Sequence, residues 1–100
     1  MYVIREIVRC KPGKVRPMVD NFKTIAAVAS EMGVGPFRIL TDVSGEAFWT
    51  VVVEIPVDHL DDFRPLEERI MADERVRAKV ANYHDLVEHG RREIYRVEQT

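Results

Sequence analysis

The sequence has little of what marks most specialised classes of protein. Its 100 residues include one cysteine, five glycines and five prolines, and there is no low-complexity tract. Cys10 has no partner for an internal disulfide and no cysteine or histidine at metal-ligand spacing, which excludes a disulfide framework and a structural zinc site. No apolar run approaches the roughly 18 residues of a membrane span, so we expect no transmembrane segment.

Neither sign of charge dominates the chain. Fifteen Lys and Arg residues stand against seventeen Asp and Glu residues, which gives a formal net charge of −2. This balance argues against a nucleic-acid interface, because such an interface needs a basic surface. Met1 leads directly into residues 2–6 without the basic and then apolar segments of a signal peptide, so we expect a cytoplasmic protein.

Hydrophobic periodicity predicts strands and helices in the first half. Residues 2–10 are rich in β-branched side chains, which favours a strand. Residues 15–32 carry apolar side chains at steps of three and four, which predicts a helix that ends near Gly33. Two further strands are predicted on either side of a Ser44-Gly45 turn, over residues 37–43 and 47–55.

Helical spacing resumes at residue 58. Pro65 falls inside this region, so we expect either a kink or a new helix with Pro65 in its first turn. Asp73 has the character of an N-cap, and Gly90 can end the helix that follows. The stripe that predicts this helix consists of Val76, Val80, Tyr83 and Val87. A last strand is predicted over residues 92–98.

The resulting order is β-α-β-β-α-β, which predicts a single α+β domain over residues 1–100. This is the ferredoxin-like arrangement, in which a four-stranded antiparallel sheet carries both helices on one face. The RNA-recognition fold has the same order, but it needs a basic sheet surface and stacking aromatics, and residues 44–47 lack the basic start of its third strand. We therefore predict no nucleic-acid partner.

Apolar side chains occur on both faces of the predicted sheet. In the third strand Trp49, Val51 and Val53 share the face that we assign to the helices, yet Phe48 and Val52 lie on the other. An exposed apolar face of this kind favours a homodimer, because a two-fold pair needs only one self-complementary surface. The alternative is that these residues reflect strand preference alone, with no partner.

Several segments resemble the dimeric α/β-barrel superfamily, most closely its NIPSNAP-like branch. They are the turn at residues 11–14 before an amphipathic helix, the 44–46 hairpin followed by Phe48-Trp49-Thr50-Val51, and the ending Gly90-Arg91-Arg92-Glu93-Ile94-Tyr95. The resemblance covers essentially the whole chain. It implies a homodimer whose sheets meet face to face as a barrel, with a small-molecule pocket between sheet and helices in each subunit. It does not imply one reaction, because the superfamily includes monooxygenases, isomerases and haem-handling enzymes.

We expect that pocket to bind a small hydrophobic molecule through Trp49, Tyr83, His84 and Phe22. His84 lies beside the apolar stripe, which suits a general base near the pocket. Two alternatives stay open. One is a cofactor-independent monooxygenase-like enzyme in which His84 or Asn21 orients a phenolic or quinone-type substrate. The other is a structural dimer without a ligand.

No metal and no cofactor are predicted. His84 and His89 lie about 140° apart around a helix, so they cannot share a ligand face. Some haem-degrading members of the superfamily use an Asn, a Trp and a His, and this chain has Asn21, Trp49 and His84 in that order. In those enzymes the Asn belongs to the first strand, whereas Asn21 falls in the first predicted helix. Haem is therefore not expected.

Overall fold

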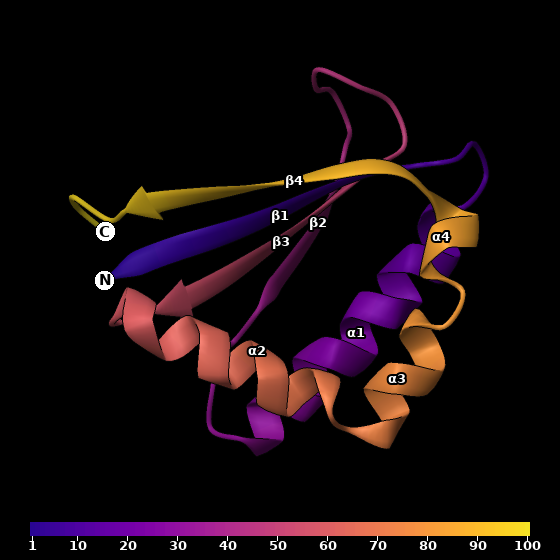
Figure 1. Cartoon of the computed structure of the whole chain (residues 1–100). Coiled ribbons are helices and arrows are strands. Elements are labelled where there is room, and N and C mark those ends of the chain that lie inside the picture. The colour runs from indigo at the N-terminus through magenta and orange to yellow at the C-terminus, as the bar shows by residue number, and fades with distance from the viewer.

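The structure is a computed structural model that describes all 100 residues. Figure 1 shows a sheet on one side and a layer of helices on the other. In chain order the elements are β1 (Tyr2–Cys10), α1 (Val15–Glu31), β2 (Arg38–Thr41), β3 (Thr50–Val57), the 3-10 helix η1 (Leu60–Asp62), α2 (Phe63–Met71), α3 (Glu74–Val80), α4 (Tyr83–Leu86) and β4 (Val87–Arg96). None of the helices has the length and apolar character that crossing a membrane requires.

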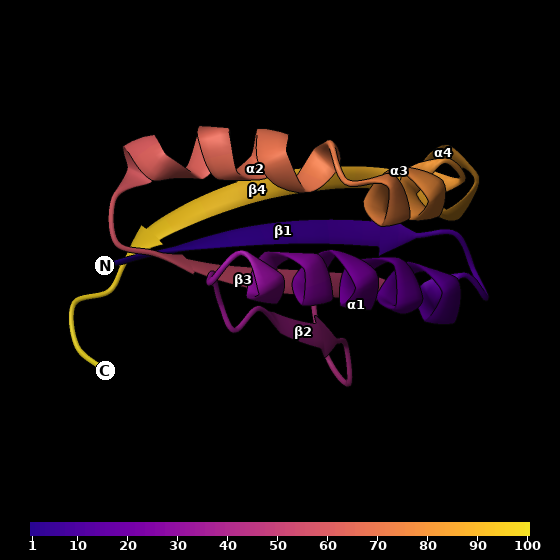
Figure 2. The same cartoon turned by 90° about the horizontal axis from the view of Figure 1, so that it is seen from below.

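The four strands form one antiparallel sheet in the order β2-β3-β1-β4. This is the ferredoxin-like α+β arrangement that the element order predicts. The helices cover one face only, and the loop between β2 and β3 projects from the other (Figure 1). Seen from the helical side, α1 and α2 run along the sheet on either side of β1 (Figure 2). The central strand β1 therefore lies under the space between these two helices.

Strand alternation and helix periodicity together build the core. Alternate residues of β1 and β3 are buried against the helices, among them Ile4, Val8, Val51 and Val53. Helix α1 contributes the buried residues Met18, Val19, Val28 and Ala29 from its apolar stripe. The helix ends as predicted, since Gly33 follows it with a φ of 80°, a conformation that glycine adopts without steric cost.

The second helical region differs from the sequence prediction. Pro65 does lie in the first turn of α2, and the Asp73 side chain does cap α3 by accepting from the Arg75 N–H at 2.8 Å. The stripe through Val87 is not one helix, however, because α3 ends at Val80 and β4 already begins at Val87. Gly90 therefore does not end a helix, but pairs with Val8 inside the sheet.

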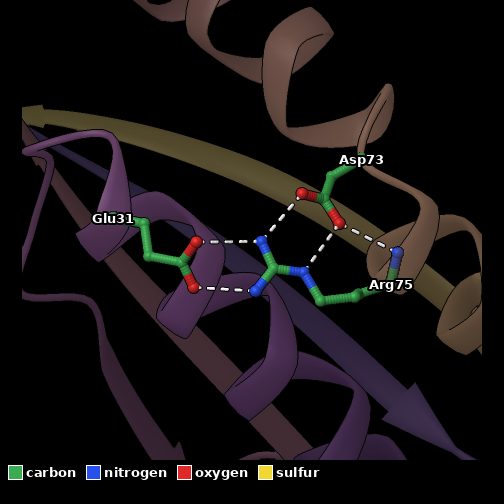
Figure 3. Close-up of polar contacts among 3 residues, drawn as sticks. All are labelled: Glu31, Asp73 and Arg75. Carbon is green, nitrogen blue, oxygen red and sulfur yellow. Dashed lines mark hydrogen bonds and ion pairs between the residues drawn. The ribbon is translucent and has the colours of Figure 1, made fainter.

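An ion-pair cluster joins α3 to the end of α1. Figure 3 shows the Arg75 guanidinium between the carboxylates of Glu31 and Asp73. It donates to Glu31 at 2.8 and 3.0 Å and to Asp73 at 2.9 and 3.1 Å. These hydrogen bonds lower the pKa of Asp73 from 3.8 to about 2 and also lower the pKa of Glu31. Glu31 therefore provides the bond between α1 and α3, and Asp73 holds the Arg75 guanidinium in place for that bond while its own carboxyl group is ionised.

The loss of this tie in acid can be measured. Because the folded pKa of Asp73 is depressed, its contribution is present above pH 3.8 and is lost as the pH falls towards about 2. At pH 6 we expect Asp73→Asn to melt at a lower temperature than the wild type, although asparagine can still cap the helix. Towards pH 2 the difference between the two curves should shrink to a small remainder, because about half of Asp73 is still ionised at its folded pKa. Asp20→Asn is the control, since Asp20 is exposed on α1 and forms no ion pair. A melting difference that persists unchanged to pH 2 would contradict this assignment.

Candidate functional site

A cavity of about 400 Å³ lies between the helix layer and the sheet. Most of its wall is apolar, and the apolar residues come from both the sheet and the helices. The wall includes Phe22 and Ile25 of α1, Val53 and Ile55 of β3, Phe63 of α2 and Val80 of α3. A volume of this size is typical of sites for small molecules and is far more than imperfect packing leaves in a protein core.

Polar side chains gather at one part of this wall. They are Glu6 of β1, Arg92 of β4, Glu67 of α2, Asn21 of α1, and Tyr83 and His84 of α4. Arg92 and His84 are exposed, so they mark the mouth of the cavity, whereas Asn21 is only 5% exposed. The cavity thus combines an apolar interior with one polar end, the arrangement that fixes the orientation of a bound molecule.

Arg92 bridges the sheet and α2 across the mouth. Its Nε donates to Glu6 Oε1, and its Nη2 donates to Glu67 Oε2 at 2.7 Å. The guanidinium carbon also lies 4.9 Å from the centre of the Phe63 ring, in cation–π geometry. Glu6 and Arg92 are neighbours because they face each other in the register of β1 and β4. We call Glu6, Arg92 and Glu67 the clasp.

Burial raises the pKa of two titratable groups of the cavity. It raises the pKa of Glu6 above its ordinary value, and the nearby Arg92 guanidinium offsets this only in part. Burial likewise raises the pKa of Tyr83, and the Glu6 carboxylate adds to that shift. A carboxylate held in an apolar wall with a raised pKa is a stronger proton acceptor than one in water.

The remaining polar residues are held by neighbouring side chains. Asn21 Nδ2 donates to Asn82 Oδ1 at 3.3 Å, which links α1 to the turn before α4. The rings of Tyr83 and His84 meet edge to face, with their centres 5.6 Å apart. A Cβ atom on Gly90 would lie 3.5 Å from the Tyr83 hydroxyl, so this hydroxyl reaches the surface of β4. Helix α4 therefore positions Tyr83 against the edge strand β4.

Four of the five residues predicted for the site lie around the cavity. Phe22, Tyr83, His84 and Asn21 line it, although they come from helices at opposite ends of the chain. Whether any of them binds a ligand or takes part in catalysis stays a prediction. They come together because α4 packs against α1 in the fold.

The prediction for Trp49 is wrong in its placement. Trp49 precedes β3, does not line the cavity and is 43% exposed. Its φ of 63° turns the chain at the start of the strand, while its carbonyl accepts from the Cys10 N–H at 2.8 Å. This turn breaks the alternation that would have placed Trp49 beside Val51 on the helical face.

The clasp residues were not predicted as site residues. Glu6 carried a detectable signal, because alternation places it on the buried face of β1 between Ile4 and Val8. A carboxylate at such a position needs a partner. Neither Arg92 nor Glu67 could be identified as that partner, since the register of β4 and the position of α2 are not readable from the sequence. In the structure, no group of three or more His, Cys, Asp or Glu side chains could hold a metal ion.

Comparison with known proteins rests on structure alone. No family model and no curated protein matches the sequence. A NIPSNAP domain protein from Burkholderia xenovorans has a TM-score of 0.76 at 20% identity, over 97% of this chain and 94% of that chain. A NIPSNAP family protein from Agrobacterium tumefaciens has a TM-score of 0.78 at 18% identity, over 95% and 90% of the two chains.

A second group of similar structures has names that refer to an enzyme. A protein from Nitrosomonas europaea, named for a proposed role as an antibiotic biosynthesis monooxygenase, has a TM-score of 0.75 at 15% identity, over 99% of this chain and all of that chain. The chain therefore shares its α+β fold with structures named for the NIPSNAP family and for an antibiotic biosynthesis monooxygenase, and this is the fold that the resemblance predicts.

Proposed function

We propose that the protein binds a small hydrophobic molecule in the cavity between the sheet and the helices. The observation that carries this proposal is the cavity itself, whose volume is about 400 Å³ and whose lining is mainly hydrophobic. Burial of apolar ligand surface there would supply about 25 cal/mol per Å². The polar end would orient the ligand, because a polar head group can be satisfied only at that part of the wall.

Titration with a neutral fluorescent probe tests this proposal. N-phenyl-1-naphthylamine becomes strongly fluorescent in apolar surroundings and carries no charge near neutral pH. We expect its fluorescence to saturate at one probe per chain. A rise in fluorescence that never saturates would show only weak adsorption to the surface, and would overturn the proposal.

A second copy of the chain is the proposed partner. The sheet face away from the helices, here called the open face, has Ile7, Val52 and Leu40 in register at its centre. The loop above it carries Val43, which is fully exposed, and Phe48, which is 78% exposed. Ile7 is already only 8% exposed, but the half-buried Val52 and Leu40 and the exposed loop residues favour a partner that removes apolar surface from water.

Charges on the open face support a copy of the same chain rather than a different protein. They form a row of alternating sign across all four strands, with pair distances of 3.7, 3.4 and 3.4 Å. In strand order from β4 to β2 the row is Glu93, Arg5, Glu54 and Arg38. A two-fold axis along the strands reverses this order, so every charge would meet one of opposite sign.

Oxygenation of a phenolic or quinol-type substrate is the second candidate function. The raised pKa of Glu6 and the presence of His84 at the mouth favour it, because either group could accept the hydroxyl proton of such a substrate. The substrate itself would supply the electrons to dioxygen, so the cavity would need no cofactor. The name of the similar protein from Nitrosomonas europaea points in the same direction.

Oxygen uptake with hydroquinone-type substrates tests this second function. If His84 is the proton acceptor, His84→Ala should reduce uptake about a hundredfold. His89→Ala is the matched control, because His89 lies on β4 and does not line the cavity. Equal rates for the wild type and both variants would remove His84 from the mechanism, and no uptake by the wild type would exclude this candidate function for the substrates tried.

A further inference from the structure

We infer that the cavity selects molecules whose polar end donates hydrogen bonds, an ammonium or hydroxyl group, and rejects carboxylates. This inference rests on the proposed function and names the chemical class of its ligand. It follows from the charges and the free acceptor atoms at the polar end, which together distinguish one head group from another.

The polar end has an excess of negative charge. Three ionisable side chains with a full charge at neutral pH line the cavity, namely the Glu6 and Glu67 carboxylates and the Arg92 guanidinium. They belong to β1, α2 and β4, while the lining residues from α1, α3, α4 and β3 add no permanent charge. Two negative charges against one positive charge leave a net negative site. A ligand carboxylate would increase that excess, whereas an ammonium group would neutralise it.

Two of the three guanidinium nitrogens of Arg92 are already engaged by carboxylates of the chain. Its Nε and Nη2 donate to Glu6 and Glu67, and its face lies over the Phe63 ring. A carboxylate ligand could take Nε and Nη2 as a bidentate pair only by displacing these charge-assisted bonds. The displaced glutamate would then be left at the same mouth without its counter-ion, which is unfavourable.

The polar end has acceptor oxygens that receive no hydrogen bond from the chain. Each clasp carboxylate uses one oxygen for Arg92, and its second oxygen accepts no hydrogen bond from the chain. Asn21 is 5% exposed and lines the cavity, and its amide nitrogen is used by Asn82 while its carbonyl oxygen has no donor. A ligand hydroxyl or ammonium supplies donors to these oxygens, and a carboxylate supplies none. An acid head group would therefore leave these oxygens without a donor and would add to their negative charge.

Competition among three ligands with the same alkyl chain tests the inference. Octylammonium, 1-octanol and octanoate differ only in the head group, and at pH 7.5 the first is a cation and the last an anion. Each is used to displace N-phenyl-1-naphthylamine from the protein. We expect octylammonium to compete at least about tenfold more strongly than octanoate, with 1-octanol in between. Equal or stronger competition by octanoate would overturn the inference.

Two substitutions connect the selectivity to the clasp. In Glu6→Gln and in Glu67→Gln the preference for octylammonium over octanoate should fall by about tenfold, because each removes one negative charge from the cavity. Glu67 lines the cavity from α2, so Glu67→Gln provides the test if Glu6→Gln does not fold. Glu68→Gln is the matched control, since Glu68 is adjacent in sequence, pairs with Arg64 and does not line the cavity. Selectivity that is unchanged in both clasp variants would overturn the inference.

Failure of the inference is distinguishable from failure of the proposed function. If the probe does not bind at a defined stoichiometry, the cavity is not a ligand site and both proposals fall. If the probe binds and is displaced best by octanoate, or by none of the three ligands, the cavity remains a binding site and only the assignment of the head group is wrong.

Discussion

An Ile25→Trp variant is expected to bind N-phenyl-1-naphthylamine at least about a hundredfold more weakly than the wild type, a loss of about 2.8 kcal/mol. Ile25 lies on α1 and lines the cavity, so the larger indole group can occupy space that the probe needs. Enlarging a side chain in a close-packed core costs about 1–3 kcal/mol. Here the cavity can accept the added volume, so the melting temperature should change little.

A tryptophan placed elsewhere controls for changes in fluorescence and stability. Leu60→Trp serves this purpose, because Leu60 is 40% exposed in η1 and does not line the cavity. This variant should keep the probe affinity of the wild type. If Ile25→Trp binds the probe as tightly as Leu60→Trp, the probe is bound somewhere other than the cavity and the proposed function fails.

The second large effect is expected at the open face, where Val52→Glu should convert a dimer into monomers. Val52 pairs with Ile7 on one side and Leu40 on the other, so a glutamate there would put a charge at the centre of the proposed interface. Leaving an unpaired charge buried costs about 3–5 kcal/mol, which weakens association at least about a hundredfold. In the single subunit the new side chain can reach water, so the fold should persist.

Gel filtration with light scattering measures this change, and circular dichroism checks that the variant remains folded. Leu60→Glu is the control, because it adds the same charge on the helical side of the molecule. We expect the wild type and Leu60→Glu to elute as dimers at micromolar concentration and Val52→Glu as a monomer. A monomeric wild type would refute the proposed homodimer and leave the open face without a partner.

Local signals explain which elements could be predicted. The strand that became β1 and the helix that became α1 were found at nearly their observed bounds, because each has an uninterrupted period of its own. Asp73 was also identified correctly, since an N-cap acts through a backbone N–H two residues away. In the second half, the spacing from Val76 to Val87 looked helical but is divided between α3, α4 and β4. Pairing of β4 with the full length of β1 outweighed that periodicity.

The residues of the candidate site also divide into those that local patterns could predict and those that they could not. Phe22, Asn21, Tyr83 and His84 were named because of their position on or beside apolar stripes, and these positions turn towards the cavity. Trp49 was named by strand alternation, which fails where a backbone with positive φ leaves the strand. The clasp was missed because its bonds join β1, β4 and α2.

The amino-acid sequence by itself determined the order of the elements, the apolar faces of the first strand and helix, and the surplus of hydrophobic side chains on both sides of the sheet. These depend on periodicity, which acts over a few residues. Only the tertiary structure decided that Glu6 and Arg92 face one another, that α2 places Glu67 beside them, and that Trp49 lies outside the cavity. Each of these depends on strand register or on the packing of segments far apart in the chain, and neither is encoded in local spacing.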